Sequence, residues 1–443
     1  MRNKIGIGPV SVALIAALAG CSSGNNGESG QAVKDAATPA QQAGPAELAK
    51  QAAQQPAELV IGSSSGATNE QFMRDYGTKI SEKFPNYKIK YVEGSFKTYI
   101  ESGQSYDIFI SSVGLTPASV LTYNLQSDIS DLVQKYRFDM TGLEPSTIDI
   151  QRQLAGGGIY GLPVNTTSAA LFYNKDLFDR FGVPYPKDGM TWEDQYDLAK
   201  KMTRSDEGTT YRGLTMAFQH LMFLNQLSAP HLDAKTYKAM FLENNFVRAF
   251  ENMARFYKIP GNELPGNTFY LNNQQDPFYK DKTVAMLLTL STGGVNFGDW
   301  NWDIAKFPVF KDKPDVGPQS YPNYFYVTST SKQRDAAFQV LSYVASEEFQ
   351  MWQAKTGTPA VLKDKSKTAS VFGVDKPLYK GKHLTAILPD KFADPTVKTL
   401  YQAAADKEVN AALGAYAAGQ DVNTVLREAA ERADKAIAAT KGK

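Results

Sequence analysis

The chain has 443 residues, of which 42% are hydrophobic, and its 47 basic and 46 acidic residues nearly cancel to a net charge of +1. The two signs are mixed throughout the chain, which gives no indication of the concentrated basic surface that a nucleic-acid-binding protein requires. The chain is longer than one compact hydrophobic core usually holds, so we expect its folded part to form two lobes.

The N-terminus is typical of a bacterial lipoprotein signal peptide. Arg2 and Lys4 precede a mostly apolar run over residues 5–20, which is too short for a comfortable permanent membrane span. The run ends in Leu-Ala-Gly-Cys at residues 18–21, which resembles a lipobox. This resemblance implies lipid transfer to the thiol of Cys21 and cleavage before it. We therefore predict an extracytoplasmic protein anchored by lipid to the bacterial cell membrane. The alternative is an ordinary secretory signal that happens to contain a cysteine.

A tether is predicted to follow this signal. Residues 21–56 are rich in Ala, Gln, Pro, Ser and Gly and lack the apolar surface that would offset the entropy of ordering. We expect a flexible segment, in which residues 46–54 form a helix transiently.

The folded part opens with alternating strand and helix patterns. Residues 58–62, 88–92 and 106–111 predict strands, and residues 69–84 predict a helix between the first two. This order predicts a parallel sheet with crossover helices. Ligands bind beyond the carboxyl ends of such strands, where this chain has two polar clusters, residues 63–66 and 111–114. Helix capping by serine is the alternative interpretation of both clusters.

The next segment, residues 160–203, carries a recognisable pattern. Residues 169–174 predict a buried strand, a helix follows over 175–181, and Thr191 is expected to cap a helix that runs to Met202, with Asp194 as the capping-box acid. The stretch YGLPVNTTSAALFYNKDLFDRFGV followed by TWEDQYDLAKKMT resembles the extracellular solute-binding proteins of family 1, the group that includes maltose-binding protein.

Further segments are similar to this family in order and spacing, at residues 282–294, 301–308 and 324–338, and an Ala-rich helical pattern over 396–437 ends the chain. The resemblance implies an α/β fold of the periplasmic-binding-protein type II class, with two lobes and a ligand cleft between them. The segments predicted on this basis are a signal peptide (1–20), the tether (21–56), an N-terminal lobe (57–166 with 327–372) and a C-terminal lobe (167–326 with 373–443).

The resemblance also implies which residues bind ligand. Carried over position by position, they are Ser64, Ser65, Ser111, Ser112, Asn165, Thr166, Thr167, Gly293 and Gly294. Maltose-binding protein has acidic groups in several of these loops where this chain has Ser, Val, Gly, Asn and Thr, which predicts a different sugar.

Aromatic residues make up 12% of the chain and suit sugar binding, because flat sugar faces stack on rings. We predict that Trp300 stacks on the ligand and that Tyr321 and Tyr324 lie near the hinge and contact it. The other prominent aromatic residues are predicted to belong to the core: Phe72, Phe84, Phe172, Trp192, Trp302 and Trp352.

No constellation of catalytic residues emerges, and we predict no catalytic residue, cofactor or metal ligand. His220 lies in an apolar stretch that predicts a satisfied, half-buried histidine. The predicted function is a monomeric receptor that captures a small solute, an oligosaccharide, and delivers it to the permease subunits of an ABC importer. The alternatives are a secreted carbohydrate-active enzyme, the same fold binding a polyamine or a ferric ion, and an adhesin or sensor partner without a small ligand.

Overall fold

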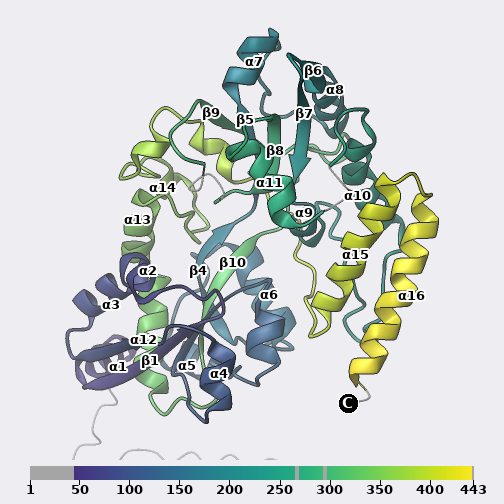
Figure 1. Ribbon diagram of the computed structural model, residues 1–443. Helices are drawn as coiled ribbons and strands as arrows, with labels where there is room; N and C mark the ends of the chain where they lie inside the picture. The colour runs from purple at the N-terminus through teal and green to yellow at the C-terminus, as the bar shows by residue number, and fades with distance from the viewer. Residues whose placement is uncertain (1–43, 265–268, 293–296, 442–443) are drawn as a thin grey trace, which may run out of the picture. The chain divides into compact units, whose positions relative to one another are not determined.

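Two five-stranded sheets organise the part of the chain that the computed structural model describes, residues 44–264, 269–292 and 297–441 (Figure 1). The first sheet has the strand order β2-β1-β3-β10-β4 and the second has the order β6-β7-β8-β5-β9. The strands are β1 (Ala57–Ser63), β2 (Tyr87–Tyr91), β3 (Ile108–Ser112), β4 (Gly161–Thr167), β5 (Ala169–Asn174), β6 (Arg204–Asp206), β7 (Thr209–Met216), β8 (Val284–Leu290), β9 (Trp302–Ala305) and β10 (Tyr321–Val327).

The first sheet confirms the parallel arrangement expected from the sequence. β1 pairs in parallel with β2 and with β3, and β10 inserts antiparallel between β3 and β4. Its helical elements are α2 (Asn69–Phe72), the π-helical turn η1 (Met73–Gly77), α3 (Thr78–Lys83), α4 (Phe96–Glu101), the turn η2 (Pro117–Leu121), α5 (Ser130–Lys135), α6 (Pro145–Leu154), α12 (Arg334–Val344) and α13 (Glu347–Lys355).

The end of the predicted tether is a helix. α1 covers Pro45–Gln54, where we expected a flexible tether up to residue 56 that forms a helix only transiently over residues 46–54. Ala53 packs against the core of the first sheet, the phenol of Tyr87 donates to the carbonyl of Ala52 at 3.0 Å, and the amide of Asn86 donates to the carbonyl of Gln54 at 3.0 Å. A short Ala-rich helix is marginal alone, and these tertiary contacts stabilise it.

The second sheet carries the helices that the sequence located best. α7 (Lys175–Phe181) begins at an Asn174 cap, and α8 (Trp192–Met202) begins with the predicted capping box between Thr191 and Asp194. The remaining elements are α9 (Phe218–Phe223), α10 (Asn244–Ala254), the 3-10 turn η3 (Arg255–Lys258), α11 (Leu271–Tyr279), α15 (Gln402–Ala417) and α16 (Val422–Lys441).

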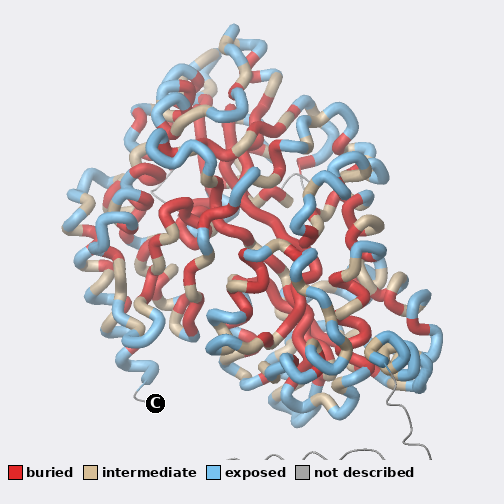
Figure 2. Tube along the Cα trace, turned by 180° about the vertical axis from the view of Figure 1, so that it is seen from behind, coloured by how far each residue is buried: buried red, intermediate tan, exposed pale blue. Residues whose placement is uncertain are grey.

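Buried residues follow the strands of both sheets and the segments that join them (Figure 2). Of the aromatic residues predicted for the core, Phe72, Phe84, Phe172, Trp192 and Trp302 are buried, whereas Trp352 is only half-buried. We use "first lobe" for the first sheet with its helices and "second lobe" for the second sheet with its helices.

The chain passes between the two sheets at two neighbouring places. β4 belongs to the first sheet and β5 to the second, and only Ser168 separates them. The return passage leads through Gln319 and Ser320 into β10. A third connection runs over residues 356–401 and contains α14 (Ser366–Ala369) and the 3-10 turns η6 (Pro377–Tyr379) and η7 (Leu384–Ile387).

Candidate functional site

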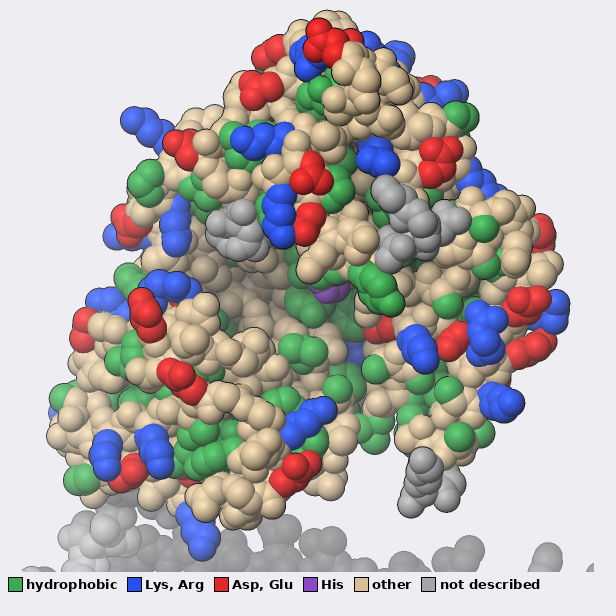
Figure 3. Space-filling view, in the orientation of Figure 1, with side chains coloured by type: hydrophobic (Ala, Val, Ile, Leu, Met, Phe, Trp, Pro, Cys, Tyr) green, Lys and Arg blue, Asp and Glu red, His purple; other side chains and the backbone are tan. Residues whose placement is uncertain are grey.

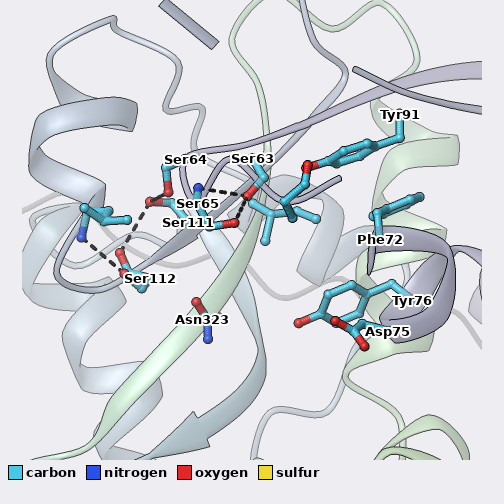
Figure 4. A pocket seen from close by; sticks show the side chains of 13 residues that line it. Ser63, Ser64, Ser65, Phe72, Asp75, Tyr76, Tyr91, Ser111, Ser112 and Asn323 are labelled. Carbon is cyan, nitrogen blue, oxygen red and sulfur yellow. Dashed lines mark hydrogen bonds between the residues drawn. The ribbon is translucent and has the colours of Figure 1, made fainter. Parts of the chain in front are cut away.

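A pocket of about 240 Å³ lies at the carboxyl ends of β1 and β3, which we call the serine pocket (Figure 4). Because β10 runs antiparallel to β3, its first residues reach the same edge, and Asn323 pairs with Ser112. The pocket therefore lies where an α/β sheet places its ligands. It is lined by Ser63, Ser64, Ser65, Ala67, Phe72, Asp75, Tyr76, Tyr91, Ile110, Ser111, Ser112, Leu115 and Asn323.

One wall of the serine pocket consists of hydroxyl groups. The hydroxyl of Ser64 donates to that of Ser111 at 2.9 Å, and the hydroxyls of Ser63 and Ser65 lie 2.7 Å apart. Ser112 accepts a bond from the backbone N–H of Leu115 at 3.3 Å, so capping explains part of its role. Each hydroxyl has one donor and two acceptor sites, so these bonds leave hydrogen-bonding capacity for a ligand. The structure thus brings together all four serines predicted from the sequence.

The opposite wall is aromatic. The rings of Phe72 and Tyr91 stack at 4.5 Å between centroids with an interplanar angle of 9°, and Tyr76 lies beside them (Figure 4). Burial raises the pKa of Tyr76 and of Tyr91, so both phenols are neutral at physiological pH. A neutral wall of rings facing a wall of hydroxyls suits a ligand with apolar faces and polar edges.

The serine pocket contains one carboxylate, that of Asp75, among its lining residues. Both of its oxygens accept bonds from the guanidinium of Arg74, at 2.7 and 2.9 Å. This bidentate pairing compensates the charge locally. The pocket therefore presents little net charge to a ligand.

The sequence analysis missed several lining residues, namely Asp75, Tyr76, Tyr91 and Asn323. Two patterns in the sequence could have identified three of these residues. Phe72, Asp75 and Tyr76 have the spacing of one helix face, and Tyr91 ends the second parallel strand, where the rule applied to β1 and β3 also holds.

Asn165, Thr166 and Thr167 lie in β4, behind the pocket and buried. The side chain of Asn165 accepts from Asn323 at 2.8 Å and donates to the phenol of Tyr76 at 3.2 Å, so it positions two lining residues. Thr167 shares a 2.5 Å hydrogen bond with Ser291 of the second lobe. These three residues support the serine pocket and do not line it.

Tyr321 lies between the serine pocket and the second lobe. Its phenol is 3.3 Å from the hydroxyl of Ser112, and its ring lies beside those of Phe223 and His220 on α9, at 5.8 and 6.1 Å between centroids. Tyr324, by contrast, is fully buried, and its phenol donates to the carbonyl of Thr147 at 2.6 Å. Tyr321 therefore lies beside the serine pocket without lining it, so its contact with a ligand stays a prediction, and Tyr324 lies in the core of the first lobe.

This geometry agrees with a comparison to known families. The family described as "Bacterial extracellular solute-binding protein" matches residues 63–351, about two thirds of the chain. The chain belongs to this family. Its fold and its family are therefore those of substrate-binding receptors.

Individual relatives of this solute-binding protein are distant. A protein of Brucella abortus (strain 2308), named as a putative binding protein, is 25% identical over 335 residues, which cover 68% of this chain and 71% of that protein. Among solved structures, an ABC substrate-binding protein from Listeria monocytogenes in complex with cycloalternan has a TM-score of 0.67 at 17% identity and covers 87% of this chain and 100% of its own. A sugar transporter from Rhizobium etli in an open conformation has a TM-score of 0.66 at 21% identity, with coverages of 85% and 99%. These likenesses show the two-lobed fold.

The surface of the solute-binding protein is hollowed between its two lobes. In the orientation of Figure 1 this hollow separates the first sheet, below, from the second sheet, above, and charged side chains of both signs are scattered around it (Figure 3). No patch of one charge dominates this face. The serine pocket belongs to the first lobe, because all its lining residues come from residues 63–115 and from Asn323.

Three ligand-binding residues were predicted in the second lobe, namely Gly293, Gly294 and Trp300. Gly293 and Gly294 lie outside the described residues. Trp300 is half-buried and packs beside Phe278 at 5.3 Å between centroids, and its indole N–H donates to the carbonyl of Phe297. Trp300 does not line the serine pocket, so its stacking on a ligand stays a prediction.

His220 is half-buried as predicted, but it is not satisfied. Among the described residues no partner reaches its buried Nδ1, and burial lowers the pKa of its imidazole. Cys21 lies outside the described residues, and within them no helix is long and apolar enough to cross a membrane.

Proposed function

We propose that this chain captures an oligosaccharide in the hollow between its lobes and delivers it to the permease subunits of an ABC importer, as a monomeric receptor held to the bacterial membrane by a lipid on Cys21. The observation that carries the proposal is the serine pocket, where neutral hydroxyls face stacked rings. Sugars need this combination, because their faces carry C–H groups and their edges carry hydroxyls. The Listeria neighbour is complexed with cycloalternan, which supports a sugar ligand.

The size of the serine pocket supports a ligand that both lobes share. Ligand sites usually enclose about 300–1,000 Å³, and this pocket encloses about 240 Å³. It would hold one end of an oligosaccharide, and the second lobe would contact the rest. A ligand that contacts both lobes stabilises the closed state over the open one. We propose the lobe boundaries expected from the sequence, 57–166 with 327–372 and 167–326 with 373–443, with one change: α1, Thr167 and the whole of β10 (Tyr321–Val327) belong to the first lobe, because β4 and β10 lie in the first sheet and α1 packs against its core.

Charged ligands fit the serine pocket poorly. A polyamine needs carboxylates, and the one carboxylate that lines the pocket is engaged by Arg74. A ferric ion needs clustered oxygen or nitrogen ligands, and no group of three or more His, Cys, Asp or Glu side chains in the described ranges could hold a metal ion.

The number of carboxylates in the serine pocket also argues against glycoside hydrolysis. Most glycosidases place two carboxyl groups across the scissile bond, about 5–10 Å apart. The serine pocket contributes Asp75 without a second acid in its lining. We therefore propose that the sugar is bound and released intact.

The test is isothermal titration calorimetry of the full purified chain with a panel of mono- and oligosaccharides, spermidine and ferric citrate, followed by chromatography of the recovered sugar. We expect saturable binding of one group of oligosaccharides, with the sugar unchanged. Cleavage of the sugar would favour the enzyme, and binding of spermidine or iron alone would overturn the choice of ligand.

A further inference from the structure

A second pocket, of about 440 Å³, lies in the third connection between the lobes, and we call it the connector pocket. It shares no lining residue with the serine pocket. At one end the carbonyl of Pro359 accepts a bond from the backbone N–H of Thr166 in β4, at 3.2 Å. At the other end Lys382 donates to the carbonyl of Trp302 in β9, at 2.5 Å. The connector pocket is thus built from chain attached to both sheets, and its volume falls in the range of small-molecule sites.

The walls of the connector pocket are mainly apolar. They include Leu362, Phe372, Leu384, Ile387 and Leu388, which come from η7 and from the loops beside α14 and η7. Apolar surface removed from water contributes about 25 cal/mol per Å². An aliphatic or aromatic group would therefore bind here more readily than a sugar, whose hydroxyls would lack partners along these side chains.

Two lysines line this apolar pocket without a carboxylate partner. Lys365 donates to the carbonyls of Pro389 and Asp390, at 2.7 and 3.3 Å, and Lys382 donates to Trp302. Within the described ranges no carboxylate lies within 4.0 Å of either ammonium group, whereas the carboxylate of Asp390 is paired with Lys306 at 2.5 Å.

The surroundings of the two lysines leave their charge only partly balanced. Burial lowers the pKa of each lysine. The attraction of more distant carboxylates acts in the opposite direction, from Glu144 and Asp390 on Lys365 and from Asp303 and Asp299 on Lys382. Each ammonium group has fewer carbonyl partners than its three N–H donors. An anion that entered the pocket would pair with charges that are already partly removed from water.

We propose that the connector pocket binds a small amphiphilic anion, an aromatic or medium-chain carboxylate or sulfonate. Its anionic head pairs with Lys365 or Lys382, and its apolar body lies against Phe372 and Leu384. This site is separate from the sugar site and does not depend on it.

The test uses 8-anilinonaphthalene-1-sulfonate, a fluorescent aryl sulfonate, titrated into the full folded chain. We expect one saturable site, from which 2-naphthoate displaces the probe and the uncharged 2-naphthalenemethanol does not. Lys365→Met or Lys382→Met, whichever removes the lysine that pairs with the head, should weaken binding about tenfold, because a hydrogen bond to a charged group contributes that much. Lys380→Met is the matched control, since Lys380 is exposed in the same segment and does not line the pocket.

A variant that fills the connector pocket tests the proposal independently of the lysine variants, whose folding could be impaired. Thr385 is exposed and lines the pocket, so Thr385→Trp should block the probe and leave the melting temperature unchanged. The proposal is overturned if the probe does not bind, if all three variants bind it as the parent does, or if the alcohol competes as well as the carboxylate. Sugar titrations of the parent chain report separately on the proposed receptor function.

Discussion

The side-chain hydroxyl of Ser168 donates a hydrogen bond to the backbone carbonyl of Gln319, at 3.1 Å. This bond joins the two segments by which the chain passes between the sheets. Ser168 is fully buried, and its own backbone N–H donates to the hydroxyl of Ser291 at 3.2 Å. These two segments, which we propose as the hinge for lobe closure, are therefore joined by a small buried network and are not independent strands.

Removing this bond should destabilise the protein measurably. Ser168→Ala leaves the carbonyl of Gln319 without its donor in a buried place, which costs about 1–3 kcal/mol. Urea unfolding would measure the loss in the free energy of unfolding. Ser205→Ala, at an exposed serine of β6, is the control and should change it little. Equal effects of the two substitutions would show that the hinge bond contributes nothing to stability.

The aromatic wall of the serine pocket should contribute to sugar affinity through the ring of Tyr91. Tyr91→Leu removes the ring that stacks on Phe72, and we expect about a tenfold loss of affinity by calorimetry, as for an aromatic stacking contribution. Tyr91→Phe keeps the ring and loses the hydrogen bonds of its phenol, to the carbonyl of Ala67 and to the side chain of Ser63, so its affinity should stay close to that of the parent. Unchanged affinity in Tyr91→Leu would move the sugar away from this wall.

A buried ionisable pair should make stability depend on pH. Lys398 donates to the carbonyl of Phe223 at 2.8 Å, and desolvation lowers its pKa to about 7. Desolvation raises the pKa of Asp406 to about 6. The imidazole of His231 lies 3.6 Å from Asp406, and desolvation lowers its pKa to about 3, so His231 stays neutral in the folded chain at physiological pH.

The sign of the effect follows from proton binding in the two states. Between about pH 7 and 10.5 the unfolded chain holds a proton on Lys398 that the folded chain has lost, so the free energy of unfolding rises with pH. Between pH 3.8 and about 6 the folded chain holds the extra proton, on Asp406, so the free energy of unfolding falls as pH rises. His231 opposes this fall, because up to pH 6.5 the unfolded chain holds a proton on His231 that the folded chain lacks. The three groups together therefore predict little change below pH 6 and a rise above pH 7.

Lys398→Met should flatten the rise above pH 7, which thermal unfolding over a pH series would measure. The control is Lys407→Met, at an exposed lysine on the same helix as Asp406, which should leave the rise intact. A rise that persists in Lys398→Met would assign it to other groups.

The proposed lipid anchor makes a prediction about Cys21. In cells supplied with labelled palmitate, the parent chain should carry the label and sediment with membranes. Cys21→Ser removes the thiol that accepts the lipid, so the label should be lost. Substitution of a neighbouring residue of the tether, Ser23→Ala, is the control. Labelling that persists in Cys21→Ser would contradict the lipobox interpretation.

The sequence located what depends on local chemistry. The capping box of Thr191 and Asp194 and the strands β1, β2 and β3 follow from residues close together in the chain, and all were predicted within two residues. The serine clusters were found because parallel strands bring their carboxyl ends to one edge.

Features that depend on distant partners could not be predicted in this way. α1 is ordered by contacts with residues more than thirty positions away, such as the bond from Tyr87 to Ala52. Tyr321 and Tyr324 are three residues apart in one strand, yet the phenol of Tyr321 contacts Ser112 at the pocket and Tyr324 is buried in the core. Which of the two lies beside the serine pocket depends on the register of β10 against β3 and β4, which no local pattern specifies.

The close approach of Gly114 to Tyr321 provides a test of how the serine pocket is joined to the hinge. A Cβ atom on Gly114 would lie 2.3 Å from the phenol oxygen of Tyr321 and 3.0 Å from the ring carbon that bears it. Gly114→Ala should therefore displace the ring, break the bond between Tyr321 and Ser112, and weaken sugar binding more than Tyr321→Phe does.

The double variant combines Gly114→Ala with Tyr321→Phe. It lacks the phenol oxygen, so the closest clash of the new Cβ atom is absent. Because the two residues are in contact, their effects should not add. We expect the loss of affinity in the double variant to be smaller than the sum of the two single losses, measured by calorimetry as a double-mutant cycle. Strictly additive losses would mean that Tyr321 tolerates the added methyl group without moving, and that Gly114 affects the sugar site by another route.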